Sequence, residues 1–152
     1  MDFDLKPEHL ELQRKVREFC DREVVPKAQE NDLKETFPWD MMPGLRRLGL
    51  LGIMFPKEYG GLGLDAISLC LILEELGRAD AALALTVESH NGLCTNHIYL
   101  NGTEEQRQKF LPRLASGQEL GAWALTEPGA GSDAASIRTR AVQDGAQWII
   151  NG

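Results

Sequence analysis

Residues 103–126, TEEQRQKFLPRLASGQELGAWALT, mark the change from one kind of secondary structure to another. Thr103 followed by Gln106 matches a capping box, in which the start of a helix satisfies its own free amide groups. Ser116 and Gly117 form a typical helix stop, and the GAWALT segment after them has the residue pattern of a short strand. The sequence therefore predicts helices up to about residue 117 and a sheet beyond it.

The chain before this boundary is predicted to be a series of helices. Apolar residues recur at the 3.6-residue helical period across residues 7–34, where we expect Pro26 to kink or end an amphipathic helix. Residues 38–49 predict a second, short helix, which Pro38 begins as a favoured first residue. The glycines and prolines of residues 53–64 predict a loop.

Two further helices are predicted in residues 65–77 and 81–100. The first, DAISLCLILEELG, is apolar on nearly every side until its Glu74-Glu75 end, as expected of a helix buried among other helices. Glu74 and Glu75, with the charged residues that follow them, are most simply interpreted as a solvated face or an ion-pair cluster between domains.

The residues after the boundary alternate between short segments typical of strands. These are GAWALT, SIRTRAV and QWIIN, with an Asp144-Gly145 hairpin turn between the last two. Helices followed by strands favour two successive domains, a helical one over residues 1–118 and a β-domain over residues 119–152. The last strand runs into an Asn-Gly turn with no partner strand after it, so we expect Gly152 to be a truncation point.

Composition places the chain among globular proteins and narrows its partners. Of 152 residues, 43% are hydrophobic, and the formal net charge of -7 comes from both signs mixed along the chain. Such a charge serves solubility and disfavours nucleic acid as a partner. No stretch approaches the roughly 20 apolar residues of a membrane span, and the N-terminus does not resemble a signal peptide. We therefore expect a cytoplasmic protein, or a mitochondrial-matrix protein without its transit peptide, and no membrane partner.

The three cysteines, Cys20, Cys70 and Cys94, are an odd number at wide spacings. Each lies in an apolar run with helical character. The pattern predicts buried thiols in a reducing compartment and no disulfide framework.

Residues 123–133, WALTEPGAGSD, carry the clearest chemical pattern in the chain. A strand delivers Leu125 and Thr126, a proline then turns the chain, and the glycines around Gly131 allow a close approach to the backbone. Exposed amides beside the Ser132 hydroxyl suit a phosphate, and the preceding strand edge suits a flat heterocycle. This pattern favours a nucleotide cofactor, although a plain surface turn fits the same residues. It is neither a Walker A loop nor a Rossmann turn.

Two other groups of residues have the chemistry of a site. His90, Cys94 and His97 share one face of a predicted helix at a spacing that suits metal ligands, but side-chain packing explains them better, and we assign no metal site. Glu88 follows the apolar run ALALTV, where it fits equally well as a carboxylate at the floor of a pocket and as a solvated residue at a helix end.

WALTEPGAGSD is similar to the signature of the acyl-CoA dehydrogenase family. Four other segments resemble family segments in the same order and at matching distances: PKEYGGLGL (56–64), EELGRAD (74–80), NGTEEQRQKFLPRLASGQ (101–118) and the closing WIING. The resemblance covers essentially the whole chain. It implies a mainly α fold, with an N-terminal helical-bundle domain followed by the first strands of a β-barrel-like middle domain.

The resemblance also implies FAD as the cofactor. By the match to the family segment, Trp123, Leu125 and Thr126 border the isoalloxazine ring, with the Thr126 hydroxyl near its reactive edge. Gly131 and Ser132 face the pyrophosphate in the same match, and Ser132 also reaches the coenzyme A arm of the substrate.

The implied reaction is α,β-dehydrogenation of an acyl-CoA thioester to the trans-2-enoyl-CoA. A carboxylate removes the α-proton, and the β-hydride passes to flavin N5. Glu88 matches a position near the closed end of the acyl pocket. The usual base of the family is a glutamate of the C-terminal domain, so no residue of this chain is assigned as catalytic, and we expect the chain by itself to be inactive.

The resemblance implies an electron-transfer flavoprotein as the electron acceptor and a homotetramer or dimer for the full-length protein. An acyl-CoA oxidase or a flavin monooxygenase of the same fold is an alternative that no residue before Gly152 separates from the dehydrogenase. A non-enzymatic helical module, binding a partner through exposed apolar surface, is a further alternative.

Overall fold

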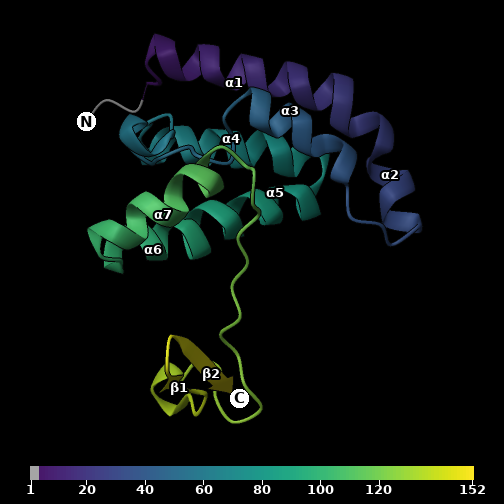
Figure 1. The fold of residues 1–152 in the computed structure, drawn as a ribbon. Coiled ribbons are helices and arrows are strands. Elements are labelled where there is room, and N and C mark those ends of the chain that lie inside the picture. Colours follow the sequence, from purple (N-terminus) through teal and green to yellow (C-terminus); the bar gives the residue numbers. More distant parts are fainter. Residues whose placement is uncertain (1–3) are drawn as a thin grey trace. The chain divides into compact units, whose positions relative to one another are not determined.

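The computed structural model describes residues 4–152 (Figure 1). Contacts between residues divide the chain into two compact units, Met1–Ala122 and Trp123–Gly152. The first unit is helical, and the second contains a β-hairpin. The mainly α fold expected from the sequence, with helices before strands, is confirmed. The domain limits 1–118 and 119–152 stay a prediction.

The helical unit consists of α-helices joined by short π-helical and 3-10 turns (Figure 1). In chain order these are α1 (Pro7–Phe19), the π-helix η1 (Cys20–Val24), α2 (Val25–Leu33), the 3-10 turn η2 (Trp39–Met41), α3 (Met42–Arg47), the 3-10 turn η3 (Lys57–Tyr59), α4 (Ala66–Ala79), α5 (Ala81–Glu88), the π-helix η4 (Ser89–Thr95), α6 (Asn96–Asn101) and α7 (Glu104–Ala115). The helices predicted in residues 38–49, 65–77 and 81–100 and the helix start at Thr103 are confirmed, except that Pro38 precedes η2 as its cap and is not the first helical residue. Within residues 4–152, no helix combines the length and the apolarity that crossing a membrane requires.

The first helical stretch passes Pro26 without ending there. Pro26 lies in the first turn of α2, where an amide N–H has no helical partner and its absence costs little. The change in structure comes just before it, in η1, where the Val25 N–H donates to the Cys20 carbonyl in the wider π-helical pattern. The interruption expected at Pro26 is therefore a change of hydrogen-bonding pattern and not a helix end.

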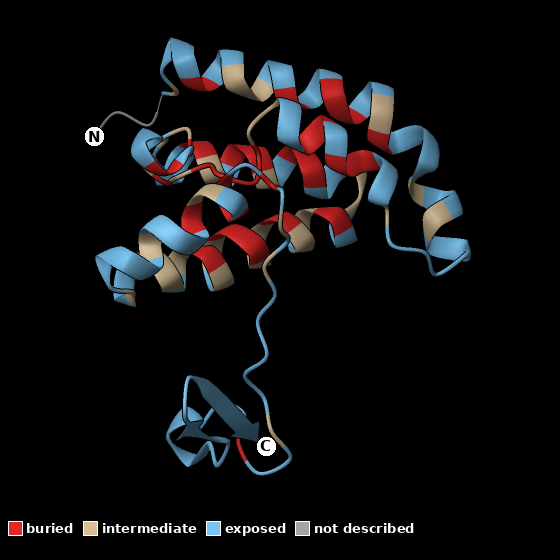
Figure 2. Cartoon of the chain, viewed as in Figure 1, coloured by how far each residue is buried: buried red, intermediate tan, exposed pale blue. Residues whose placement is uncertain are grey.

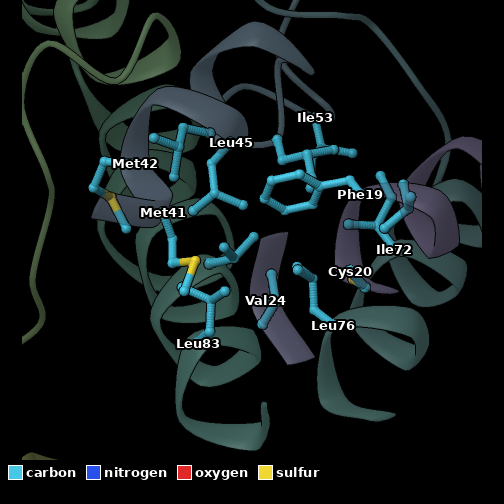
Figure 3. Close-up of a cluster of buried hydrophobic side chains, with 14 residues drawn as sticks. Phe19, Cys20, Val24, Met41, Met42, Leu45, Ile53, Ile72, Leu76 and Leu83 are labelled. Atoms are coloured by element: carbon cyan, nitrogen blue, oxygen red, sulfur yellow. The ribbon is translucent and has the colours of Figure 1, made fainter. Parts of the chain in front are cut away.

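A cluster of buried apolar side chains from α1, η1, α3, α4 and α5 forms the core of the helical unit (Figure 3). Val16, Phe19 and Val24 confirm the apolar stripe expected on the first helical stretch, and Leu45 and Leu83 are fully buried beside them. Each such side chain stabilises the fold by about 1.5–3 kcal/mol relative to exposure. Figure 2 shows the buried residues on the inward sides of the helices.

Helix α4 is buried along one face and not on nearly every side. Leu71, Ile72 and Leu76 lie on that face, whereas Ile67 is 50% exposed. The helix packs against α1 and α5. The apolar residues of its sequence exceed what these two neighbours cover, and so the prediction of all-round burial is wrong.

The cysteines differ in burial, contrary to the expectation of three buried thiols. Cys20 is fully buried, and burial raises the pKa of its thiol to about 11. Cys94 is partly buried and Cys70 is exposed. Cys70 lies outside the buried face of α4, which the apolar run around it did not reveal.

Glu75 is a buried residue of α4 and not part of a solvated face. Its side chain points into the helical unit, where the guanidinium groups of Arg17 and Arg78 donate hydrogen bonds to the carboxylate. Glu74, its neighbour, is exposed as expected. A buried carboxylate needs such cationic partners, since an unpaired charge is costly to remove from water.

The second unit contains two antiparallel strands, β1 (Arg140–Asp144) and β2 (Gln147–Asn151), with Val142 opposite Ile149. Gly145 begins the turn between them with a left-handed φ of 58°, which glycine adopts at little cost. The hairpin predicted at Asp144-Gly145 is confirmed, and its first strand begins at Arg140.

The strand predicted for GAWALT is not formed. Residues 120–126 have no regular secondary structure, and the only ladder within the described part of the chain joins β1 and β2. A strand needs a neighbour to satisfy its amide and carbonyl groups, and none of the described residues supplies one here. Beyond this segment follow a bridge between Glu127 and Ala130 and the 3-10 turn η5 (Ala134–Ser136).

Candidate functional site

A hollow of about 700 Å³ in the second unit, which we call the Thr126 hollow, contains two of the predicted cofactor residues. Leu125 and Thr126 line it from the irregular segment before the turn, Ile137 and Thr139 line it from the residues before β1, and Ile150 lines it from β2. Its lining combines apolar side chains with two hydroxyl groups. A hollow of this kind suits a flat ring with polar atoms at its edge.

The chain makes a hydrogen-bonded turn directly after Thr126. The Glu127 N–H donates to the Ala130 carbonyl at 2.9 Å, and the Ala130 N–H donates back at 3.1 Å. This short bridge separates the segment that carries Leu125 and Thr126 from the glycine-rich segment after it. Ala130 is buried, while Leu125 and Thr126 stay exposed to the hollow.

Glu127 holds this turn to the segment before β1, a role that sequence reasoning missed. Its carboxylate accepts hydrogen bonds from the backbone N–H groups of Arg138 at 2.8 Å and Thr139 at 2.9 Å. Hydrogen bonds from Thr139 and Arg138 hold the pKa of Glu127 below its ordinary value. An acid before a Pro-Gly turn was the only available signal, since its partners lie more than ten residues further along the chain.

Gly131 and Ser132 lie in the exposed turn and do not line the Thr126 hollow. A Cβ atom added to Gly131 would meet no heavy atom within 4 Å, and Gly131 does not have a positive φ. The fold of this chain therefore does not itself require glycine at this position. Because packing within the chain does not explain the glycine, its exposed backbone suits the close approach of another molecule.

Trp123 begins the second unit and is 39% exposed. It does not line the Thr126 hollow. Of the predicted cofactor residues, the structure thus brings Leu125 and Thr126 together at one hollow and places the other three in exposed positions of the same unit.

Glu88 is the last residue of α5 in the helical unit and is partly buried. Its carboxylate lies over Gly92, where a Cβ atom would come within 2.5 Å of Glu88 Oε1. Gly92 therefore leaves the room that the carboxylate occupies. Glu88 does not lie at a helix end, because the helical path continues beyond it through η4.

His90 uses both ring nitrogens inside the helical unit. Nε2 lies 3.0 Å from the Leu51 carbonyl and 3.2 Å from the Leu114 carbonyl, and Nδ1 accepts a hydrogen bond from the Gly121 N–H at 2.8 Å. Burial lowers the pKa of His90. Within residues 4–152, no group of three or more His, Cys, Asp or Glu side chains is arranged to hold a metal ion.

Comparisons with known proteins agree on one family. Residues 6–118 match the family model described as "Acyl-CoA dehydrogenase, N-terminal domain". The short-chain-specific acyl-CoA dehydrogenase of Clostridium acetobutylicum is 42% identical over 152 residues, which are 100% of this chain and 40% of that protein.

Two solved structures share the fold. A chain in the structure of the electron transferring flavoprotein of Acidaminococcus fermentans superposes with a TM-score of 0.94 at 39% identity, over 100% of this chain and 40% of that one. The acyl-CoA dehydrogenase of Bacillus anthracis, complexed with FAD, superposes with a TM-score of 0.87 at 39% identity, over 98% of this chain and 26% of that one. The chain thus spans about 40% of the length of the curated relative it matches. The family model, the identity and the fold together establish that this chain belongs to the acyl-CoA dehydrogenase family.

Proposed function

We propose that the full-length protein catalyses the FAD-dependent α,β-dehydrogenation of an acyl-CoA thioester to the trans-2-enoyl-CoA. The observation that carries this proposal is the Thr126 hollow, lined by Leu125 and Thr126 of the segment that resembles the cofactor-binding segment of the family. Family membership supplies the class of reaction, and the hollow supplies a place for the flat ring of the cofactor.

Several residues of the second unit offer groups that suit FAD. Leu125 offers apolar contact to one side of the isoalloxazine ring, and the Thr126 hydroxyl offers a hydrogen bond to the reactive edge of the ring. Trp123 offers a large aromatic side chain at the border of the same ring. When bound, FAD supplies the acceptor for the β-hydride of the substrate.

The turn after the hollow fits the charged part of the ligands. Gly131 presents a backbone without a side chain, and the exposed Ser132 presents a hydroxyl group beside it. Amide and hydroxyl donors in an open turn suit the FAD pyrophosphate. We assign Ser132 to the coenzyme A arm of the substrate as well.

Glu88 is proposed to mark the closed end of the acyl pocket. Its partly buried carboxylate lies over Gly92, at the junction of α5 and η4. The base that removes the α-proton is expected from the C-terminal domain of the family. The chain described here contributes ligand-binding residues and no catalytic base.

We further propose a homotetramer or dimer located in the cytoplasm, with an electron-transfer flavoprotein as the acceptor. The likeness to a chain in the A. fermentans structure, which is described as an electron transferring flavoprotein, supports that choice of acceptor. Transfer of electrons to a protein acceptor separates this function from that of an oxidase, which passes them to oxygen.

Product analysis tests the proposal. The natural gene is expressed through its own stop codon, and the purified protein is incubated with a panel of acyl-CoAs and an artificial electron acceptor. We expect one substrate class to lose two hydrogens by mass spectrometry and to give the trans-2-enoyl product by chromatography. An oxygenated product, or hydrogen peroxide formed at the rate of turnover, would instead identify a monooxygenase or an oxidase. Failure to convert any acyl-CoA would refute the proposal.

A further inference from the structure

The π-helix η4 is the only described element that carries three buried polar side chains, His90, Asn91 and Thr95. It begins directly after Glu88 and continues the path of α5. Short π-helical segments inside α-helices are uncommon and frequently mark functional sites. In η4, the wider turn brings His90 and Cys94 against the last residues of the helical unit.

His90 holds the backbone at the point where the chain leaves the helical unit. Its Nδ1 accepts the hydrogen bond from the Gly121 N–H, which can only donate. The ring proton must therefore be on Nε2, which donates to the carbonyls of Leu51 and Leu114. One neutral histidine thus joins η4, the loop after α3, the end of α7 and the segment that follows α7.

Gly121 can occupy this place only because it has no side chain. A Cβ atom there would lie 2.6 Å from Cys94 Sγ and 3.4 Å from His90 Nδ1. The backbone of the next residue, Ala122, lowers the pKa of the Cys94 thiol, against the larger rise that burial causes. Both of the last two residues of the helical unit therefore lie beside η4, and the next residue is Trp123.

We propose that His90 is a positioning residue for the cofactor: by holding the Gly121 N–H, it fixes the start of the cofactor-binding segment at Trp123. This inference rests on the proposed function, because the segment from Trp123 to Ser132 is assigned to FAD there. A buried acceptor at Nδ1 restrains Gly121 in one position. Loss of that acceptor leaves a partly buried N–H without a partner, which shifts the segment and weakens its binding to the cofactor.

Asn91 provides an internal comparison within the same π-helix. Its side chain donates to the carbonyls of Leu50 and Val87 and accepts from the Ile53 N–H at 3.1 Å. It is as buried as His90 and as fully hydrogen-bonded, but it holds the loop after α3 and not the exit of the chain. A purely structural role for η4 predicts equal effects from both residues, whereas the positioning role predicts an effect on the cofactor from His90 alone.

Two amide variants of the full-length protein separate the two ring nitrogens. His90→Gln keeps a donor near the position of Nε2 and removes the acceptor for Gly121, whereas His90→Asn keeps an acceptor near the position of Nδ1 and removes the donor. We expect His90→Gln to raise the Kd for FAD about tenfold and to alter the visible circular dichroism of the flavin. We expect His90→Asn to restore both values to within about twofold of the wild type, even where both variants unfold at a lower temperature.

Gly121→Ala and Asn91→Ala complete the test. Gly121→Ala displaces the same backbone, because its methyl group would clash with Cys94, and it is expected to weaken FAD binding, which keeps the proposal testable if His90→Gln does not fold. Asn91→Ala is expected to lower the unfolding temperature without changing the Kd of the folded protein. An unchanged Kd and flavin spectrum in both His90→Gln and Gly121→Ala would overturn the positioning role. A wild-type protein that takes up no FAD would overturn the proposed function itself, so the two failures are distinguishable.

Discussion

Glu75 is 1% exposed, and its carboxylate accepts two hydrogen bonds from the Arg17 guanidinium, at 2.9 and 2.7 Å. This bidentate pair joins α1 to α4 across 58 residues of sequence. Arg78 donates a third hydrogen bond to the same carboxylate at 3.2 Å and another to Asp21. The hydrogen bonds from Arg17 lower the pKa of Glu75, which keeps the carboxylate charged inside the helical unit.

The first prediction concerns this pair. Glu75→Gln leaves Arg17 without its bidentate acceptor, and we expect the free energy of unfolding of the chain to fall by about 2 kcal/mol. That value is below the usual loss for a fully buried pair because Arg17 itself is half exposed. Chemical denaturation measures the change. The neighbouring exposed residue serves as the matched control, with Glu74→Gln changing stability by less than about 0.5 kcal/mol. Equal losses in the two variants would contradict the pairing.

The second prediction is a pH dependence set by Asp65. The Ser68 N–H and hydroxyl donate to its carboxylate at the start of α4, and these hydrogen bonds lower the pKa of Asp65 from 3.8 to about 2. Because the folded state binds its proton less readily than the unfolded state, this contribution to stability is present above pH 4 and is lost as the pH falls towards 2.

Asp65→Asn tests that dependence, since asparagine also caps helices but does not titrate. Thermal unfolding between pH 4 and pH 2 is expected to change less steeply in the variant than in the wild type. Parallel curves would show that the Asp65 cap does not titrate in the way its hydrogen bonds require.

Local signals account for the part of the fold that could be predicted from the sequence. The capping box is formed as expected, with the Thr103 N–H donating to Gln106 Oε1 at 2.8 Å and the Gln106 N–H donating back to Thr103 Oγ1 at 3.3 Å. Gly117 ends α7 with a left-handed φ of 73°. Both features depend on residues within one or two turns of each other, which a sequence displays directly.

The features that could not be predicted depend on contacts between distant residues. The burial of Glu75 follows from Arg17, and the anchoring of Gly121 follows from His90, 31 residues earlier. The missing strand at residues 120–126 follows from the absence of a neighbouring strand among the described residues. The assignments of Leu125 and Thr126 came from resemblance to a family, and their shared lining of one hollow was visible only in three dimensions.

The third prediction addresses the hydroxyl of Thr126. Thr126→Val keeps the shape of the side chain and removes the hydrogen bond proposed for the reactive edge of the flavin. We expect kcat of the full-length enzyme to fall about five- to tenfold, as for the loss of one such bond, with little change in thermal stability. Thr86→Val is the matched control, because the Thr86 hydroxyl donates within α5 of the helical unit and is not assigned to the cofactor. An equal or larger loss in the control would contradict the role assigned to Thr126.

The fourth prediction uses the open backbone at Gly131. Gly131→Ala fits the fold without a clash, so we expect an unchanged unfolding temperature and about tenfold weaker FAD binding, because the new methyl group occupies the space of the pyrophosphate. Gly129→Ala is equally free of clashes and is not assigned to the cofactor, so it is expected to bind FAD normally. Titration of the apoprotein with FAD measures both. Equal affinities in the two variants would remove Gly131 from the site.

The visible absorption spectrum of the full-length protein, recorded before and after anaerobic addition of each acyl-CoA, tests the central claim most directly. A flavin-dependent dehydrogenase is expected to be yellow as purified and to lose its flavin absorption on addition of its own thioester, with no added reductant. A colourless protein that takes up no FAD, or a yellow one that no acyl-CoA bleaches, would contradict the account.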